Sequence, residues 1–310
     1  MTCMDFVTIV FDNKREIDLL KIQLITLSNV EDNLINNFFV LFNDQKEKVE
    51  NYVPEILNHC PANLLNRLKV IYVEELTGKD EESNYCSDWW SQQTAKILVS
   101  KIVTTSKYLV LDAKNHFISP ITSNTFFNDK GEIIIYNAVH NDDLMDWYKC
   151  AFDYFGLDNI EKYNPYHHPL YIQTTTPFVF IKEHVIGLIN HVEEKENKLF
   201  FDFFYDAKKY TEFFFYYAYL CFINKTNEYV FVSRQIDNAI VGPHDPNKYE
   251  WNSWKSKSEF LVNYRPSTFS LSSKCVNILD REYKENIKMF YRFRFYNLQI
   301  DNLISTILEI

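Results

Sequence analysis

Three polar residues follow a short apolar run in residues 108–115 (YLVLDAKN). The run predicts a buried strand, which brings Asp112 to the edge of a sheet with Lys114 and Asn115 close behind it. A carboxylate there can bind a divalent ion or a ribose, and such an ion neutralises a leaving diphosphate. Lys114 can add positive charge for the same phosphates. Asp112 could equally cap the next turn, so a functional and a purely structural interpretation both stay open.

A second polar group lies on a helix predicted over residues 88–103, with Asp88 as its cap. Helical spacing places four residues on one face, namely Trp89, Gln92, Gln93 and Lys96. Another face is apolar and predicts the side that meets the core, with Ala95, Leu98, Val99 and Ile102. The polar face with its tryptophan either lines a ligand site or faces solvent.

Alternating strand and helix patterns position these residues in the first third of the chain. Strands are predicted over residues 6–11, 38–42, 70–73 and 108–111, and helical stretches lie between them. Apolar strands separated by helices predict a mostly parallel sheet that is buried on both faces. Ligands of such sheets bind outside the carboxyl ends of the strands. These ends carry Asp12, Asp44, Glu74 and Asp112.

The pattern changes after a turn signal at residues 128–131 (NDKG). Strands are predicted over residues 133–136, 178–181 and 229–233, and helices over 142–155, 184–194 and 211–222. Helical spacing puts Leu144, Trp147 and Tyr148 on a buried face. Because neither a repeat nor a flexible linker is visible, we expect one compact body with a mixed second half.

Composition excludes several functional classes. The net charge is −10, which disfavours nucleic acid as a partner. The six cysteines are scattered without a CxxC pair, which disfavours a zinc ribbon and a disulfide framework. Neither a dinucleotide nor a P-loop fingerprint is present, and the chain has only five glycines. A nucleophile-elbow sequence is also missing. The start of the chain is too charged for a signal peptide, so a reduced, cytoplasmic protein is expected.

The block from Trp89 through Gln93 and Lys96 to Asp112 and Asn115 resembles a bacterial GT-A-type glycosyltransferase family, formerly catalogued as a domain of unknown function (DUF6492-like). Its pattern is a Trp, a Gln-Gln pair, a Lys and a hydrophobic strand that ends in Asp. Weaker similarities follow elsewhere, at Asp12, Leu20, Ser28, Thr176-Pro177-Phe178-Val179, Lys182 and Thr211-Glu212. Together they run from about residue 6 to residue 219.

The resemblance implies a GT-A-like (Rossmann-like) fold, a nucleotide-diphosphate sugar as donor and a bacterial surface glycan, lipid-linked or oligosaccharide, as acceptor. It places Asp112 at the diphosphate, Lys114 and Asn115 beside it, and Trp89, Gln92, Gln93 and Lys96 around the donor. Asp12 and Asp44 are expected near the nucleoside. Glu212 is expected as the base for the acceptor hydroxyl, with Asp202 and Asp206 as rivals.

The resemblance also implies a divalent metal ion, Mn²⁺ or Mg²⁺, with Asp112, Asn115 and the late His244 as candidate ligands. The family motif has a second aspartate where this chain has Lys114, and this difference disfavours metal binding. His167 and His168 are adjacent, and their side chains point different ways unless the backbone turns, so they do not predict a metal site.

Residues 1–135 are expected to bind the donor and residues 136–310 the acceptor. Alternating phenylalanines with Lys288, Arg292 and Arg294 predict a strand or a peripheral contact with the inner membrane. The alternatives are a nucleotidyltransferase and a non-catalytic protein that binds carbohydrate or nucleotide.

Overall fold

A computed structural model describes residues 3–77, 88–117, 120–139, 142–166, 170–235, 238–241 and 268–271. Its helices are α1 (Lys14–Thr26), α2 (Lys46–Val49), α3 (Val53–His59), α4 (Val73–Thr77), α5 (Trp89–Leu98), α6 (Asp142–Tyr154), α7 (Lys182–Glu196), α8 (Phe200–Ala207) and α9 (Glu212–Phe222). Its strands are β1 (Met4–Val10), β2 (Ile35–Phe42), β3 (Leu68–Tyr72), β4 (Lys107–Asp112), β5 (Asn115–Phe117), β6 (Ile133–Val139), β7 (Leu170–Ile172), β8 (Phe178–Ile181), β9 (Tyr229–Gln235), β10 (Asn238–Val241) and β11 (Thr268–Leu271).

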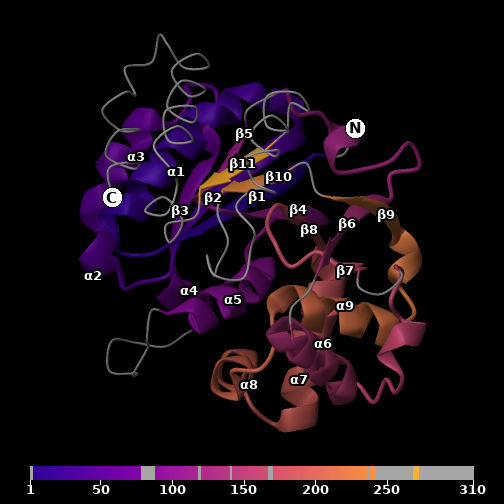
Figure 1. Cartoon of the computed structure of the whole chain (residues 1–310). Coiled ribbons are helices and arrows are strands. Elements are labelled where there is room, and N and C mark those ends of the chain that lie inside the picture. Colours follow the sequence, from indigo (N-terminus) through magenta and orange to yellow (C-terminus); the bar gives the residue numbers. More distant parts are fainter. Residues whose placement is uncertain are drawn as a thin grey trace.

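The central sheet has the strand order β3-β2-β1-β4-β8 (Figure 1). β1 pairs in parallel with both β2 and β4, β2 pairs in parallel with β3, and β8 closes the sheet antiparallel to β4. Every residue of β1 is buried, as expected for a central strand that helices cover on both faces. The predicted α/β architecture, a mostly parallel sheet flanked by helices, is confirmed.

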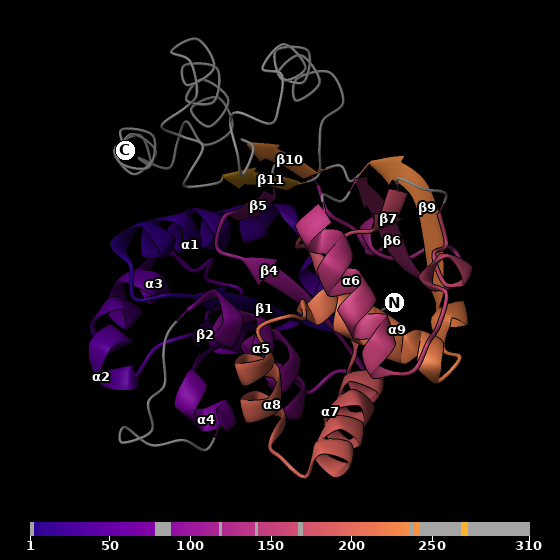
Figure 2. The ribbon, with the colours of Figure 1, turned by 60° about the horizontal axis from the view of Figure 1, so that its bottom comes forward.

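Helices cover both faces of this sheet. Figure 2 shows α1 and α3 on one face and α5 and α8 on the other. α5 begins at a capping box, in which the Asp88 carboxylate accepts from the backbone of Ser91 at 2.9 Å and the Ser91 hydroxyl accepts from the backbone of Asp88 at 3.0 Å. The cap fixes where the helix starts and therefore which of its residues face the sheet.

The second half builds a smaller, mixed sheet with the order β7-β6-β9, and β6 pairs antiparallel with β7 and parallel with β9. α9 packs against this sheet, where the ring centroids of Tyr217 and Phe231 of β9 are 5.8 Å apart. It is buried over almost its whole length, because its sequence EFFFYYAYLCF is aromatic on every side. Rings of α6 and α9 pack edge to face, as in the pair Tyr148–Phe214 with centroids 5.1 Å apart.

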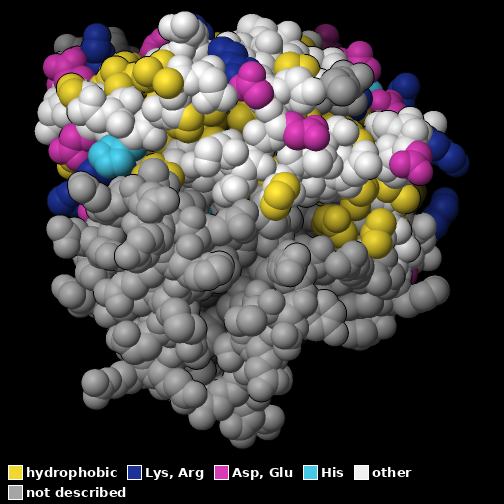
Figure 3. All heavy atoms as spheres, turned by 90° about the horizontal axis from the view of Figure 1, so that it is seen from above, with side chains coloured by type: hydrophobic (Ala, Val, Ile, Leu, Met, Phe, Trp, Pro, Cys, Tyr) yellow, Lys and Arg dark blue, Asp and Glu magenta, His cyan; other side chains and the backbone are white. Residues whose placement is uncertain are grey.

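The two predicted halves share elements. The predicted boundary between residues 135 and 136 falls inside β6, and β8 of the second half completes the central sheet of the first. Within the described residues, no helix is long and apolar enough to cross a bilayer. On the described part of the face in Figure 3, acidic and basic side chains are interspersed.

Candidate functional site

The turn after β4 holds Asp112 in place through contacts from both sides. The backbone N–H of Asp112 donates to Oδ1 of Asn115 at 2.7 Å. From α1, Nε2 of Gln23 donates to the carbonyls of Asp112 and Asn115 at 2.8 and 2.9 Å, and Thr8 of β1 donates to Oε1 of the same glutamine. The position of Asp112 is therefore set by β1 and α1 as well as by its own strand. The sequence offered no signal for Gln23.

A buried ammonium group lies behind Asp112. Nζ of Lys96 is 2.9 Å from Oε1 of Glu212 and 3.2 Å from Oδ1 of Asp112, so one cation joins α5, α9 and β4. The side chains of Lys96 and Glu212 are 4% and 0% exposed. On the outer side, Nζ of Lys114 lies 3.3 Å from Oδ2 of Asp112 and is 36% exposed. Asp112 thus stands between one buried and one accessible cation.

The electrostatics of this group follow from burial and charge. Burial raises the pKa of Asp112, but the ammonium groups of Lys96 and Lys114 outweigh it and hold that pKa below its ordinary value. Burial also opposes the charge of Lys96, yet Asp112 and Glu212 together raise its pKa. For Glu212 burial wins, and its pKa is raised despite the nearby Lys96. Asp112 and Lys96 are therefore ionised. Of the two carboxyl groups, Glu212 is the one that is protonated more easily.

Gln93 extends the group toward the end of α5. When its amide nitrogen faces Glu212, it lies 2.8 Å from Oε1 of that carboxylate, and Oε1 of Gln93 accepts from the indole N–H of Trp89 at 3.2 Å. The predicted polar face of this helix is therefore real. It does not line an open cleft, however: Gln92, Gln93 and Lys96 are buried because α8 and α9 pack over them. Of the four residues only Trp89 is exposed.

The remaining predicted residues have local roles or lie elsewhere. Asp12 is exposed after β1 and shares a hydrogen bond with Tyr52. Asp44 is buried after β2, where its carboxylate accepts from the backbone of Gln45 at 3.1 Å and pairs with Lys48 at 3.2 Å.

Glu74 does not end a strand, because β3 stops at Tyr72 and Glu74 lies in α4. Asp202 and Asp206 lie on α8, where Asp206 pairs with Lys198 at 2.5 Å. The predictions for His167, His168, His244, Lys288, Arg292 and Arg294 lie outside the described residues.

The donor set at the end of β4 does not fit a divalent metal ion. Asp112 already faces the ammonium groups of Lys96 and Lys114, which repel a second cation. Oδ1 of Asn115 accepts from the backbone of Asp112 and so points into the turn. Among the described residues at this strand end, Lys114 supplies the accessible positive charge that the metal was expected to supply.

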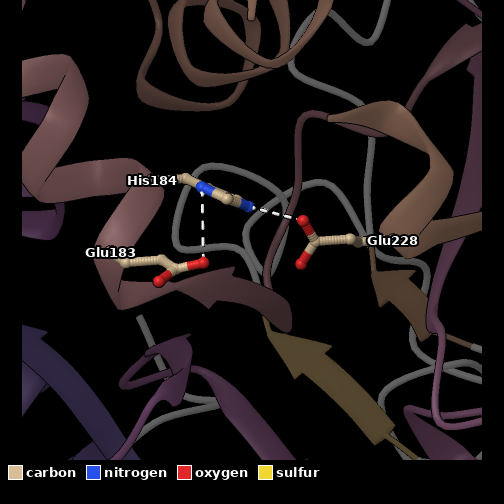
Figure 4. Close-up of side chains that lie close together, drawn as sticks. All are labelled: Glu183, His184 and Glu228. Atoms are coloured by element: carbon tan, nitrogen blue, oxygen red, sulfur yellow. Dashed lines mark hydrogen bonds and ion pairs between the residues drawn. The ribbon is translucent and has the colours of Figure 1, made fainter. Parts of the chain in front are cut away.

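A different group of potential metal ligands joins α7 to the turn before β9. One ligand atom from each of Glu183, His184 and Glu228 comes within 4.8 Å of the others (Figure 4). Nε2 of His184 is 2.9 Å from Glu228, Nδ1 is 3.9 Å from Glu183, and Lys225 pairs with the same oxygen of Glu228 at 3.6 Å. Because the two ring nitrogens face different carboxylates, we assign the group to a tie between α7 and the turn before β9.

Comparison with solved structures finds glycosyltransferases. The galactosyltransferase LgtC in complex with donor and acceptor sugar analogs is 12% identical, with 91% of this chain and 95% of that chain covered, at a TM-score of 0.46. Mouse xyloside xylosyltransferase 1 is 13% identical, with 89% of this chain and 99% of that chain covered, at a TM-score of 0.44. Apo GlyE of Streptococcus pneumoniae TIGR4 is 14% identical, with 99% of this chain and 62% of that chain covered, at a TM-score of 0.45. TM-scores below 0.5 do not establish a shared fold, so the functional proposal rests on the site.

No curated protein is similar enough to the chain to count as a match. The family described as "Family of unknown function (DUF6492)" matches residues 10–260, well over half of the sequence. The chain therefore belongs to the DUF6492 family, as the resemblance in residues 89–115 predicted.

Proposed function

We propose that the chain is a glycosyltransferase that moves a sugar from a nucleotide-diphosphate sugar to a bacterial surface glycan of capsule or lipopolysaccharide type. The place of the Asp112–Lys114 pair in the sheet is the observation that carries the proposal. We place the reaction in the cytoplasm, where a lipid-linked acceptor would be met at the inner membrane.

The pair lies at the topological switch point of the sheet. The chain runs from β1 outward through β2 to β3, and β4 then adds on the other side of β1. Ligands of open α/β sheets bind in the crevice at the carboxyl ends of such diverging strands. Asp112 is the last residue of β4 and pairs in register with Ile9 of β1. A nucleotide ligand is therefore expected between the ends of β1 and β4, with Asp12 on the nucleoside side and Asp44 further along the same edge.

Lys114 has the chemistry and the exposure to bind the diphosphate. In glycosyl transfer the bond between the anomeric carbon and the phosphate oxygen breaks, and the acceptor hydroxyl bonds to that carbon and loses its proton. The leaving diphosphate takes up the electron pair of the broken bond, and its freed phosphate oxygen accepts the hydroxyl proton, so an ammonium group beside it lowers the barrier. Asp112 orients that ammonium group from 3.3 Å away, and Lys96 keeps Asp112 ionised.

Glu212 has a positioning role in this proposal. The base expected from the sequence must touch an acceptor hydroxyl, but Glu212 is fully buried and faces Lys96 and Gln93 instead. Its carboxylate fixes Lys96 next to Asp112. Gln93 and Lys96 thus support the donor site from behind and do not line it.

The proposal is tested by thermal shift with a panel of nucleoside diphosphates and nucleotide sugars. A ligand whose free concentration is about a hundred times its Kd stabilises the folded state by about 2.7 kcal/mol. Lys114→Ala removes a charge-assisted contact of about 1.5–3 kcal/mol, so the Kd is expected to rise roughly tenfold to a hundredfold. The same shift is expected with EDTA as with Mn²⁺, because Lys114 takes the place of the metal.

The end of β2 provides a matched control. Lys48 pairs with Asp44 at 3.2 Å, nearly the distance of the Lys114–Asp112 pair, but β2 is not at the switch point. Lys48→Ala is expected to leave the shift unchanged. If no nucleotide raises the melting temperature, or if both lysine variants respond alike, the donor site is refuted. Binding without release of the sugar would instead favour the non-catalytic alternative, which the burial of Glu212 supports.

A further inference from the structure

Three tryptophans from two helices that are far apart in the sequence form one cluster. Trp89 and Trp90 open α5, and Trp147 lies in the middle of α6. The ring centroids are 4.6 Å apart for Trp89–Trp90, 5.5 Å for Trp89–Trp147 and 5.7 Å for Trp90–Trp147. We propose that this tryptophan cluster binds a pyranose ring of the acceptor glycan; the assignment to the acceptor rests on the proposed function.

The cluster is accessible although it is apolar. Trp89 is 42% exposed, and Trp90 and Trp147 are half-buried. For a large aromatic side chain this fraction leaves roughly 100 Å² open to solvent. A pyranose presents one face of C–H groups, and these stack favourably on the electron-rich face of an indole. The exposed surface therefore suits one sugar ring.

The charges around the cluster favour a neutral sugar over a nucleotide. α6 begins with Asp142 and Asp143 and carries Asp146 directly before Trp147, and all three aspartates are exposed. Asp143 stands one helical turn before Trp147 on the same face, where its carboxylate can accept from sugar hydroxyls. The same carboxylates repel a diphosphate. This separates Trp89 from the donor site, to which the sequence had assigned it.

The cluster is linked to the strand end by a continuous set of contacts. The Trp89 indole donates to Gln93, Gln93 donates to Glu212, and Glu212 pairs with Lys96, which in turn pairs with Asp112. Trp147 belongs to the half of the chain that was expected to bind the acceptor. A sugar stacked on the cluster would therefore be held beside the donor site without occupying it.

The test uses the full chain with ¹⁵N-labelled tryptophan and no nucleotide. The chain has five tryptophans, and their indole N–H signals are assigned from Trp→Phe variants. Lactose, cellobiose, maltose and chitobiose are titrated to high millimolar concentration. At least one is expected to shift the signals of Trp89, Trp90 and Trp147 saturably. Trp89→Ala is expected to raise the Kd of that disaccharide at least tenfold, because the variant loses the exposed apolar area on which the sugar stacks.

Phe222→Ala is the matched control, because Phe222 is also 42% exposed but lies at the end of α9. It is expected to leave the sugar titration unchanged. The proposal is overturned if none of the four disaccharides shifts the cluster, or if only Trp251 and Trp254 respond.

Nucleotide-sugar binding to Trp89→Ala separates this inference from the proposed function. Unchanged binding is expected, and a loss as large as that of Lys114→Ala would return Trp89 to the donor site and overturn the acceptor assignment. If the wild type binds a disaccharide and no nucleotide, the transferase proposal fails while the tryptophan cluster stands as a carbohydrate site.

Discussion

Replacing Lys96 with methionine tests whether one buried cation holds the site together. Methionine has a similar length and shape but leaves Glu212 with no exposed surface and no positive charge beside it. Breaking a buried ion pair by removing one partner costs about 3–5 kcal/mol. Glu212→Gln is expected to cost less, about 1–3 kcal/mol, because Lys96 keeps Asp112 at 3.2 Å. Urea unfolding followed by circular dichroism measures both losses.

The double variant separates charge from packing. With Lys96→Met and Glu212→Gln together, the buried ion pair is gone and no buried charge is left alone, since Asp112 still has Lys114 at 3.3 Å. The loss of unfolding free energy is then expected to fall short of the sum of the single losses by about 2 kcal/mol, within the range of coupling energies for contacting residues.

The pH dependence gives an independent check on the single variant. Burial already raises the pKa of Glu212, and removing Lys96 takes away the largest effect that opposes it. A carboxyl group whose folded pKa is raised stabilises the fold at low pH and loses that contribution as the pH rises. The difference between Lys96→Met and the wild type is therefore expected to be smaller at pH 5 than at pH 8. Additive losses, or a difference that does not depend on pH, would refute the ion network.

Further variants probe other parts of the fold. Gly187→Ala places a methyl group 2.7 Å from the hydroxyl of Tyr219, so a loss of about 1–3 kcal/mol is expected, and removing the hydroxyl with Tyr219→Phe should restore most of it. Asp88→Ala removes the cap of α5 and should cost about 0.5–2 kcal/mol in urea unfolding. Burial lowers the pKa of His116 to about 4 from 6.5, so stability is expected to fall by about 3 kcal/mol as the pH drops from 6.5 through 4. His59 is only half-buried, and His59→Gln serves as the control for His116→Gln.

Each of these predictions has a contrary result. An unrescued Gly187→Ala would show that the methyl group meets something other than the hydroxyl. An Asp88→Ala chain as stable as the wild type would mean that the capping box contributes nothing. For His116, an acid transition that is the same in His116→Gln and in the wild type would assign the acid sensitivity to other groups.

The sequence alone was sufficient to predict those elements whose residue pattern lies within one short stretch of the chain. The parallel strands of the first third contain short, largely apolar runs between helical stretches, and β1, β2, β3 and β4 all appear where such runs lie. Asp112 follows from the same logic, since a polar residue after a buried strand must lie at the sheet edge. The family pattern in residues 89–115 also lies in one continuous stretch, so it too was visible without the fold.

Only the tertiary structure decided what these residues contact. The periodicity of α5 shows which residues share a face, but not that α8 and α9 cover that face and bury Lys96 and Gln93. The ion pair of Lys96 with Glu212 spans 116 positions, a separation over which no local pattern gives information.

Trp147 illustrates the same limit. Its helical spacing predicted only a buried face, whereas packing of α6 against α5 sets it beside Trp89 at the surface. Strand order, and with it the switch point beside Asp112, is likewise a property of the folded sheet. Periodicity in sequence fixes which way a side chain points from its own element, and only the packing of elements determines what it meets there.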